Sequence, residues 1–194
     1  MGVERDLKVQ RAWALVLAVA LALMVAVTRL VPVDYRPYNF AAVGALALFT
    51  GARVGLWQAL LISFVAMLAS DSVLLWQNDF NAHYVPFASV YAAIAVYGLI
   101  GWFVVGGSEN AFRIGFSALV GSTTFFLITN FASWLSPIHG YDRSVGGLID
   151  AYAAGLPFIK GTLIGDFMYT ALLFGAAAVL SRVLVPHAET VRCR

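Results

Sequence analysis

The sequence predicts an all-α integral membrane protein, with six transmembrane helices in a single domain that covers residues 1–194. Three observations predict this class. Of the 194 residues, 61% are hydrophobic and only 11% are charged, whereas a soluble domain carries about 25% charged residues. Uncharged stretches of 18 or more residues occur, which is the length needed to cross roughly 30 Å of hydrocarbon. No charged or low-complexity segment is left over to form a second domain.

Six apolar segments are expected to form the helices, at about 12–30, 38–50, 56–76, 86–105, 112–135 and 158–185. The first segment is longer than the hydrophobic region of a signal peptide, so it should be retained. Pro37 stands at a favoured first helical position before the second segment, and the turn GARVG leads into the third. A short extra helix is expected at about 146–156, because Gly155 and Pro157 should stop it.

The distribution of basic residues predicts the orientation. Eight Lys and Arg residues lie at the two termini and in the connections on the same side, and four lie on the other side. By the positive-inside rule both termini should be cytoplasmic. The net charge of +2 is small and gives no reason to expect a nucleic-acid partner.

The fifth segment carries polar residues that a lipid-facing helix would not need. At 100° per residue they fall within one arc, which contains Ser122, Thr123, Thr129, Asn130, Ser133, Trp134 and Ser136. This face should therefore meet protein or a cavity. Asn130 and Trp134 are candidate ligand contacts, whereas Asn130 could equally hydrogen-bond to a neighbouring helix.

Two carboxylates in apolar segments, Asp71 and Asp166, are candidate ligand contacts. Asp166 lies about 9 Å beyond Lys160 by helical rise, and a carboxylate inside a membrane is costly enough to indicate function. Thr162 and Thr170 are placed to hydrogen-bond it. The alternative is that Asp166 caps a neighbouring helix or pairs with an arginine. Asp71 is near the end of the third helix, where the dipole disfavours a negative charge, so it should have a partner.

The longer connections on the outer side contain most of the remaining polar and aromatic residues. The candidate ligand contacts there and at the adjoining helix ends are Arg36, Asn39, His83 and Tyr91, and Arg36 is also a candidate partner of Asp71. His83 is the most metal-competent side chain of this face, although a loop histidine is more often only solvated. An interfacial aromatic belt explains part of the aromatic content without any ligand.

On the first helix, small residues recur every fourth position, at Ala14, Ala18, Ala22 and Ala26. Such a ridge suits close packing against another helix, inside the protein or in a partner. Phosphate-binding GxxxxGK[ST], HExxH and GxSxG motifs are all missing. No nucleophile and base are arranged together, so the chain is not expected to be an enzyme and no intrinsic cofactor is expected.

Four stretches, YNFAAVGALALFTGARVG, VAMLASD, TNFASW and YAAGLPFIKGTLIGDFMYTALLFG, resemble a family of small bacterial membrane proteins labelled as transport proteins. The architecture is similar to the S components of energy-coupling-factor vitamin transporters, and most of all to the BtuM-like cobalamin proteins. The resemblance implies six helices, a multi-pass location in the bacterial inner membrane, and a substrate site closed by outer loops 1, 3 and 5. The alanine ridge resembles the motif that docks on a coupling subunit.

The expected function is thus capture and uptake of a vitamin-type molecule, with cobalamin as the transported ligand and ATPases as energising partners. In the BtuM-like family a cysteine of loop 3 can ligate the corrin cobalt, but the only cysteine here is Cys193. His83 lies in the corresponding loop and would supply the ligand instead. The alternative function is a non-catalytic accessory subunit of a larger membrane complex, in which Asn130 and Asp166 only hold helices together.

Overall fold

The structure is a computed structural model that describes residues 2–31, 35, 40, 42–76 and 87–184. These residues form six α-helices and two short helical turns, and they contain no strand. The helices are α1 (Gly2–Leu30), α2 (Val43–Arg53), α3 (Leu56–Trp76), α4 (Phe87–Ile100), α5 (Ala111–Leu135) and α6 (Val145–Leu184). The sequence prediction of an all-α chain is confirmed for the described residues.

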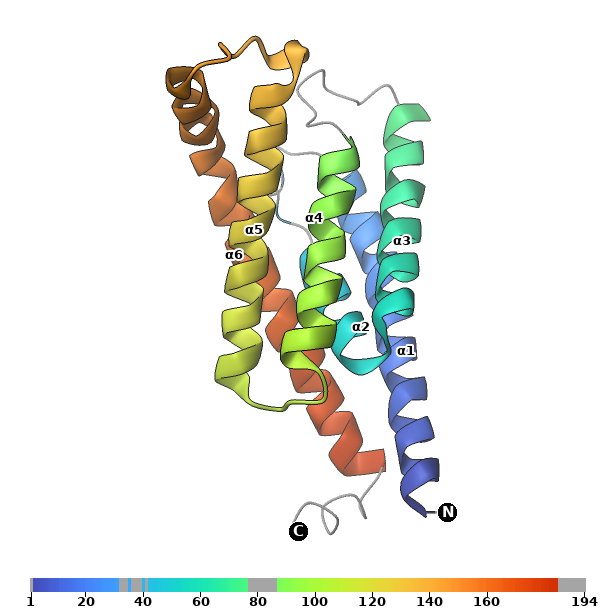
Figure 1. The fold of residues 1–194 in the computed structure, drawn as a ribbon. Coiled ribbons are helices and arrows are strands. Elements are labelled where there is room, and N and C mark those ends of the chain that lie inside the picture. The colour runs from blue at the N-terminus through green and yellow to red at the C-terminus, as the bar shows by residue number, and fades with distance from the viewer. Residues whose placement is uncertain (1, 32–34, 36–39, 41, 77–86, 185–194) are drawn as a thin grey trace.

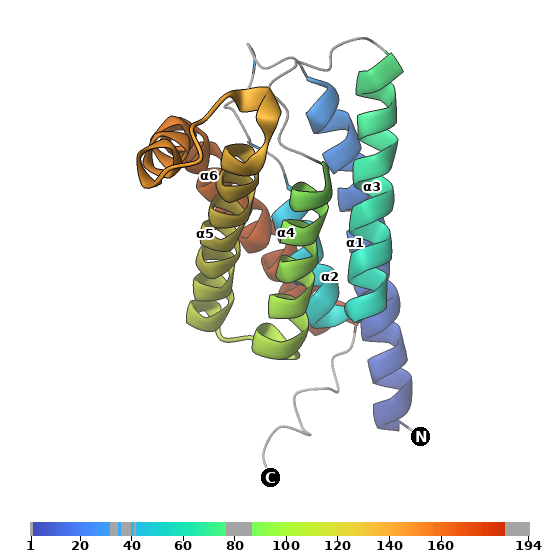
Figure 2. The same ribbon diagram turned by 45° about the horizontal axis from the view of Figure 1, so that its top comes forward.

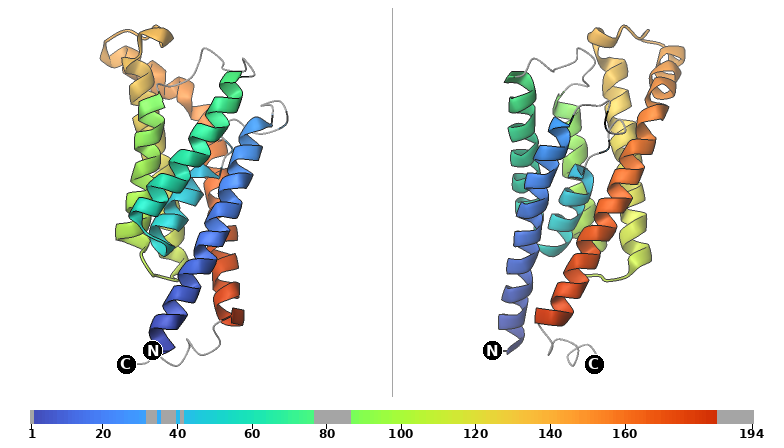
Figure 3. Two further views of the ribbon diagram at one scale, coloured as in Figure 1. Left: turned by 90° about the vertical axis from the view of Figure 1, so that its right-hand side faces the viewer. Right: turned by 180° about the vertical axis from the view of Figure 1, so that it is seen from behind.

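The helices form an elongated bundle in which successive helices, the short α2 included, run in opposite directions, so that α1 and α3 are parallel (Figure 1). α1 and α3 lie side by side along one flank, and α5 and α6 pack together along the other, with α4 between the two pairs (Figures 1 and 3). The first residues of α1 and the last residues of α6 lie at the same end of the bundle. The view from above shows α2 enclosed by the other helices (Figure 2).

Four helices are long and apolar enough to cross a membrane, namely those that contain Leu56–Leu74, Ala88–Val105, Ala111–Leu135 and Val145–Val183. The apolar part of α1, Arg11–Val27, and the whole of α2 are shorter than this. The protein is therefore a membrane protein with transmembrane helices.

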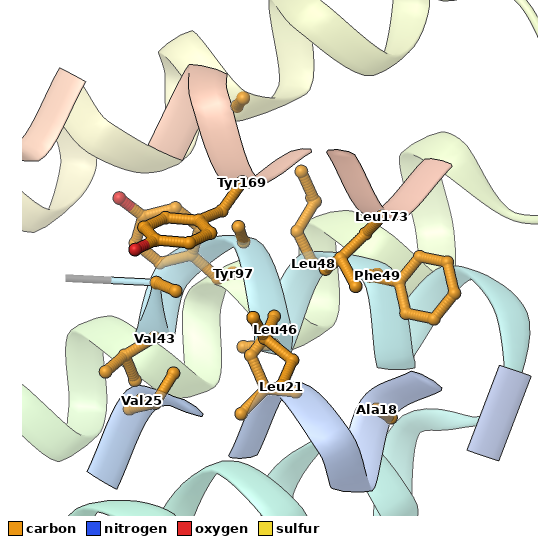
Figure 4. Packing of buried hydrophobic residues seen from close by; sticks show 14 of the residues in the cluster. Ala18, Leu21, Val25, Val43, Leu46, Leu48, Phe49, Tyr97, Tyr169 and Leu173 are labelled. Atoms are coloured by element: carbon orange, nitrogen blue, oxygen red, sulfur yellow. The ribbon is translucent and has the colours of Figure 1, made fainter. Parts of the chain in front are cut away.

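The short helix α2 forms the centre of the core. With 11 residues it extends only about 16 Å, roughly half of the hydrocarbon thickness. Every side chain from Ala45 to Thr50 is buried. Figure 4 shows α2 between α1, which contributes Leu21 and Val25, and α6, which contributes Tyr169 and Leu173. Because α2 is covered on all sides, its apolar residues contribute to packing rather than to contact with lipid.

Close backbone approach fixes the crossing of α2 with α4. A Cβ atom at Gly51 would collide with the carbonyl oxygen of Gly98, and one at Gly101 would collide with that of Leu48. Only glycine at these two positions allows the backbones to lie this close. α4 then ends in a π-helical turn over Gly101–Val105, closed by the bond from the Gly106 N–H to the Gly101 carbonyl at 2.8 Å.

The predicted segments at 56–76, 86–105 and 112–135 correspond to α3, to α4 with its π-helical turn, and to α5. The prediction for the second segment was wrong at both ends. α2 begins at Val43 rather than near residue 38, and it continues through Gly51 to Arg53, which leaves only a two-residue turn before α3. The first helix begins at Gly2 rather than near residue 12, since apolar length marks the membrane-embedded part of a helix and not its first residue.

The prediction of a separate helix at 146–156 was also wrong. α6 is one continuous helix of 40 residues with Pro157 in its interior. Its first part runs across the end of the bundle, and the rest descends along α5 (Figure 3). Proline removes one backbone donor and pushes on the preceding turn, so it bends a helix that tertiary packing holds together. We refer to Val145–Leu156 as the α6 arm.

Candidate functional site

The polar arc predicted on α5 faces the interior of the bundle. Ser117, Ser122, Thr129 and Ser133 are buried, whereas Leu127, Phe131 and Leu135 on the opposite face are exposed. Thr123 is the exception among the residues placed in the arc, since it is exposed and donates to the carbonyl of Leu119. The two-sided character of this helix is thereby confirmed.

A buried polar cluster surrounds Asp166, whose exposed fraction is 2%. The hydroxyl groups of Tyr97 on α4 and of Ser122 on α5 both donate to its Oδ2 atom, the latter at 2.7 Å. The backbone N–H of Ala45 on α2 donates to the same carboxyl group. One side chain thus connects α6 to three other helices.

The contact with Ala45 places Asp166 at the N-terminus of α2. The N-cap position is Ala42, which has no side chain able to accept a hydrogen bond from the first turn. The first N–H groups of a helix have no partner within that helix, and a negative group is favoured there by the helix dipole. Asp166 supplies the missing acceptor from another helix. This is the helix-capping arrangement considered above as the alternative for Asp166.

Two glycines make room for this cluster. A Cβ atom at Gly44 would lie 2.5 Å from Oδ1 of Asp166 and 2.7 Å from the ring of Tyr97. A Cβ atom at Gly121 would collide with the same ring, at its Cε1 atom. Tyr97, at 1% exposed, is therefore clamped between α2 and α5 with its hydroxyl directed at Asp166.

The expected threonine partners of Asp166 do not make these bonds. Thr162 donates to the carbonyl of Phe158 at 3.3 Å. The hydroxyl of Thr170 is buried and has no hydrogen-bond partner among the described residues. Thr162 and Thr170 share one face of α6 with Asp166, but the hydroxyl groups that reach its carboxyl group come from α4 and α5. Its contact with Ser122 places Asp166 level with the middle of α5.

Asn130 lies elsewhere, at the crossing of α5 with the α6 arm. Its Nδ2 atom donates to the carbonyl of Phe126 at 2.8 Å. A Cβ atom at Gly155 would collide with the Asn130 amide, so the two helices touch here. Asn130 and Ser122 are eight residues apart on α5, which separates Asn130 from the Asp166 cluster by about 12 Å. The structure does not bring Asn130 and Asp166 together.

Trp134 lies at the end of α5 and contacts the segment that leads into α6. Its indole N–H donates to the carbonyl of Asp142 at 2.8 Å. The guanidinium group of Arg143 lies 5.8 Å from the indole ring centroid and donates to the carbonyls of Trp134 and Leu135. Arg143 thereby satisfies carbonyl groups that the helix end leaves without partners.

A second buried cluster contains Asp71 and Tyr91, two of the candidate ligand contacts. Asp71 forms a salt bridge with Arg29 at the end of α1, and the side chains are 5% and 12% exposed. The hydroxyl of Tyr91 on α4 donates to the other carboxyl oxygen at 3.0 Å. Asp71 does have a basic partner as expected, and that partner is Arg29. Arg36, the partner suggested from the sequence, lies outside the described residues, as do Asn39 and His83.

The alanine ridge of α1 is turned toward the bundle. Ala18 is fully buried and Ala14 is 6% exposed, while Ala22 and Ala26 are partly buried. Small side chains let α1 lie close to the central helices, which is the packing alternative stated for the ridge. In this structure Ala14 and Ala18 are not accessible to another protein.

Tyr97, Ser122 and Arg29 were not singled out from the sequence as site residues. Arg29 carried a detectable signal, since it is a charge at the end of an apolar helix. Ser122 was placed on the polar arc, but its partner 44 positions away was not predicted. Tyr97 carries no such signal, because its role depends on a residue 69 positions away. Among the described residues no group of three or more His, Cys, Asp or Glu side chains could hold a metal ion.

The fold and these clusters define a helical membrane protein whose buried polar groups connect its helices. The chain belongs to the Family of unknown function (DUF6580), whose pattern it matches over residues 8–188. No curated protein and no solved structure gives a significant match to the chain.

Proposed function

We propose that this protein is a membrane substrate-binding and uptake protein for a vitamin-type small molecule, built like an S component of an energy-coupling-factor transporter. The observation that carries the proposal is the Arg29–Asp71–Tyr91 cluster. It lies in the half of the bundle that α2 does not reach, because α2 begins level with the middle of α4 and ends where α3 begins. A polar cluster there would form part of the wall of a substrate site.

Further support comes from the arrangement of the helices. The start of α1 and the end of α6 share one end of the bundle, as an even number of crossings requires. In the proposed topology α1 and α2 complete the six spans, and the basic residues place both termini in the cytoplasm of a bacterial cell. The connections 31–42, 77–86 and 136–144 then lie on the outer side and would gate the site.

The proposed ligand is a corrinoid such as cobalamin, on the basis of the resemblance to BtuM-like proteins. In this proposal Arg36, Asn39, Asp71, His83, Tyr91, Asn130 and Trp134 contact the ligand, and the imidazole of His83 ligates the cobalt. Asp166 supports the site by holding α2 in place. The protein catalyses no covalent reaction, and uptake depends on loop movement with or without an energising ATPase module.

Binding and uptake assays test the proposal. Purified protein incubated with cobalamin should bind it in calorimetry and carry the visible absorption of a corrinoid. Asp71→Asn should weaken binding, whereas Asp150→Asn, an exposed carboxylate on the α6 arm, should not. His83→Ala should change the visible spectrum of the bound ligand. The proposal fails if no corrinoid binds and a strain that depends on the protein takes up the vitamin normally without it.

A second candidate function is that of a non-catalytic accessory subunit. The contacts of Asn130 and Asp166 favour it, because both side chains hydrogen-bond within the bundle. Native mass spectrometry of the protein from its own membrane distinguishes the two functions. Stable co-purification with a larger assembly, without a small ligand, would support the accessory role and contradict uptake.

A further inference from the structure

An apolar groove of about 370 Å³ lies between α5 and the α6 arm. It is lined by Phe126, Leu148, Ile149, Tyr152, Ala153 and Leu156. Its volume falls within the range of small-molecule sites in proteins, about 300–1,000 Å³. The groove is separate from the Asp166 cluster and from the Arg29–Asp71 pair.

The groove lies where the α6 arm crosses α5, and contacts of Tyr152 join its two walls. Pro157 lies inside α6, the arm runs in another direction than the rest of the helix (Figure 3), and Gly155 of the arm contacts Asn130 of α5. The hydroxyl of Tyr152 donates to the carbonyl of Leu127 at 3.0 Å, and its ring lies 5.7 Å from that of Phe126. These contacts fix the Tyr152 side chain, and the groove exists without a ligand.

The chemistry of the lining matches a hydrocarbon chain. Five of the six lining side chains are hydrocarbon, and the one hydroxyl among them already has an acceptor. Ile149 and Leu156 are 63% and 57% exposed, which is costly in water and favourable in a bilayer. An occupant therefore needs apolar volume and no hydrogen bonds, and the surrounding membrane supplies acyl chains.

The charges beside the groove indicate the headgroup. Asp142 and Arg143 precede the arm, Asp150 lies on it and Lys160 follows it by one turn, and all four residues are exposed. A headgroup with a phosphate and an ammonium group complements this balanced mixture, whereas a purely anionic headgroup would leave both carboxylates without a cationic group to face. The indole of Trp134 also lies in this region, as is typical of the membrane interface.

We propose that the groove binds one acyl chain of a phospholipid with an ammonium-bearing headgroup of the phosphatidylethanolamine type. Phe126 and Tyr152 form the floor, Ile149 and Leu156 form the sides, and Arg143 with the neighbouring carboxylates receives the headgroup. The site depends on the bend at Pro157, because a straight α6 would place the arm along α5 and close the groove.

Lipid retention tests this site with a matched pair of variants. The full-length protein is reconstituted into nanodiscs of equimolar phosphatidylethanolamine and phosphatidylglycerol, extracted into a mild detergent, and weighed by native mass spectrometry. The unaltered protein should retain one phosphatidylethanolamine molecule. Ala153→Phe fills part of the groove and removes about ten carbon–carbon packing contacts of the bound chain, which should lower retention about tenfold.

Ala154→Phe is the control, because Ala154 is the next residue of the arm, is exposed, and does not line the groove. It should retain lipid as the unaltered protein does. Circular dichroism and gel filtration show whether each variant folds, and Ala153→Leu replaces Ala153→Phe if the larger side chain prevents folding. Absence of retained lipid from the unaltered protein, or equal retention by the Ala153 and Ala154 variants, would overturn the proposal. Retention of phosphatidylglycerol instead would overturn the headgroup assignment.

Discussion

Replacement of Asp166 by alanine should destabilise the bundle, because it removes the acceptor that α2, α4 and α5 share. Ser122 keeps a second acceptor, the carbonyl of Ala118 at 3.0 Å. The hydroxyl of Tyr97 and the N–H of Ala45 would be left buried without a partner. A buried donor without a partner costs about 1–3 kcal/mol, so two of them cost about 2–6 kcal/mol.

In a membrane, hydrogen bonds between helices contribute roughly 0.6–2 kcal/mol each. The loss of stability caused by Asp166→Ala should therefore fall in the lower part of the range of about 2–6 kcal/mol. We therefore expect Asp166→Ala to lower the free energy of unfolding by about 2–3 kcal/mol. Asp166→Asn keeps one carbonyl oxygen as an acceptor but presents an NH₂ group to the remaining donors. It should cost about 1 kcal/mol, partly because the neutral amide interacts less with the N-terminus of α2.

Equilibrium unfolding in mixed micelles with increasing dodecyl sulfate, followed by far-UV circular dichroism, measures these differences. Asp150→Ala is the matched control, since Asp150 is an exposed carboxylate of the same helix. It should change stability by no more than about 0.5 kcal/mol. If Asp166→Ala unfolds within about 0.5 kcal/mol of the unaltered protein, Asp166 does not act as the cap of α2 and the assignment is refuted.

Three further predictions follow from other parts of the structure. Gly155→Ala should lower the free energy of unfolding by about 1–3 kcal/mol, since the new methyl group overlaps the Asn130 amide. The double variant Gly155→Ala with Asn130→Ala should recover most of this loss in the same unfolding assay. Additive losses from the two changes would contradict the contact between these residues. Arg29→Ala leaves Asp71 buried with Tyr91 as its remaining partner in the described part of the chain and should cost about 2–4 kcal/mol. Arg29→Met combined with Asp71→Leu should cost less than the single change, and a double variant less stable than Arg29→Ala would argue against a buried pair. Cys193 is the only cysteine, so a membrane-impermeant maleimide should label it only after intact cells are permeabilised; labelling of intact cells would disprove the cytoplasmic C-terminus.

The local features of the fold could be predicted from the sequence. The lengths of the apolar segments and the Gly-rich turns between them predicted the positions of α3, α4 and α5. Such long segments are expected because each spanning segment in a membrane must satisfy its own backbone hydrogen bonds. The polar arc of α5 was also predicted, since helical periodicity alone decides which residues share a face. Asp71 and Asp166 stood out because a carboxylate in an apolar helix needs a partner.

The identity of those partners was decided only by the tertiary structure. Asp166 meets Ser122 and Tyr97, and Asp71 meets Arg29, across 44, 69 and 42 positions of sequence. No local pattern encodes such pairs, which depend on the order in which the helices pack. The tertiary structure also decides that α6 continues through Pro157 and that α2 is enclosed by other helices, for the same reason. Contacts with neighbouring helices hold Pro157 inside a helix, and they allow an 11-residue helix without a cap of its own to begin at a carboxyl group of another helix.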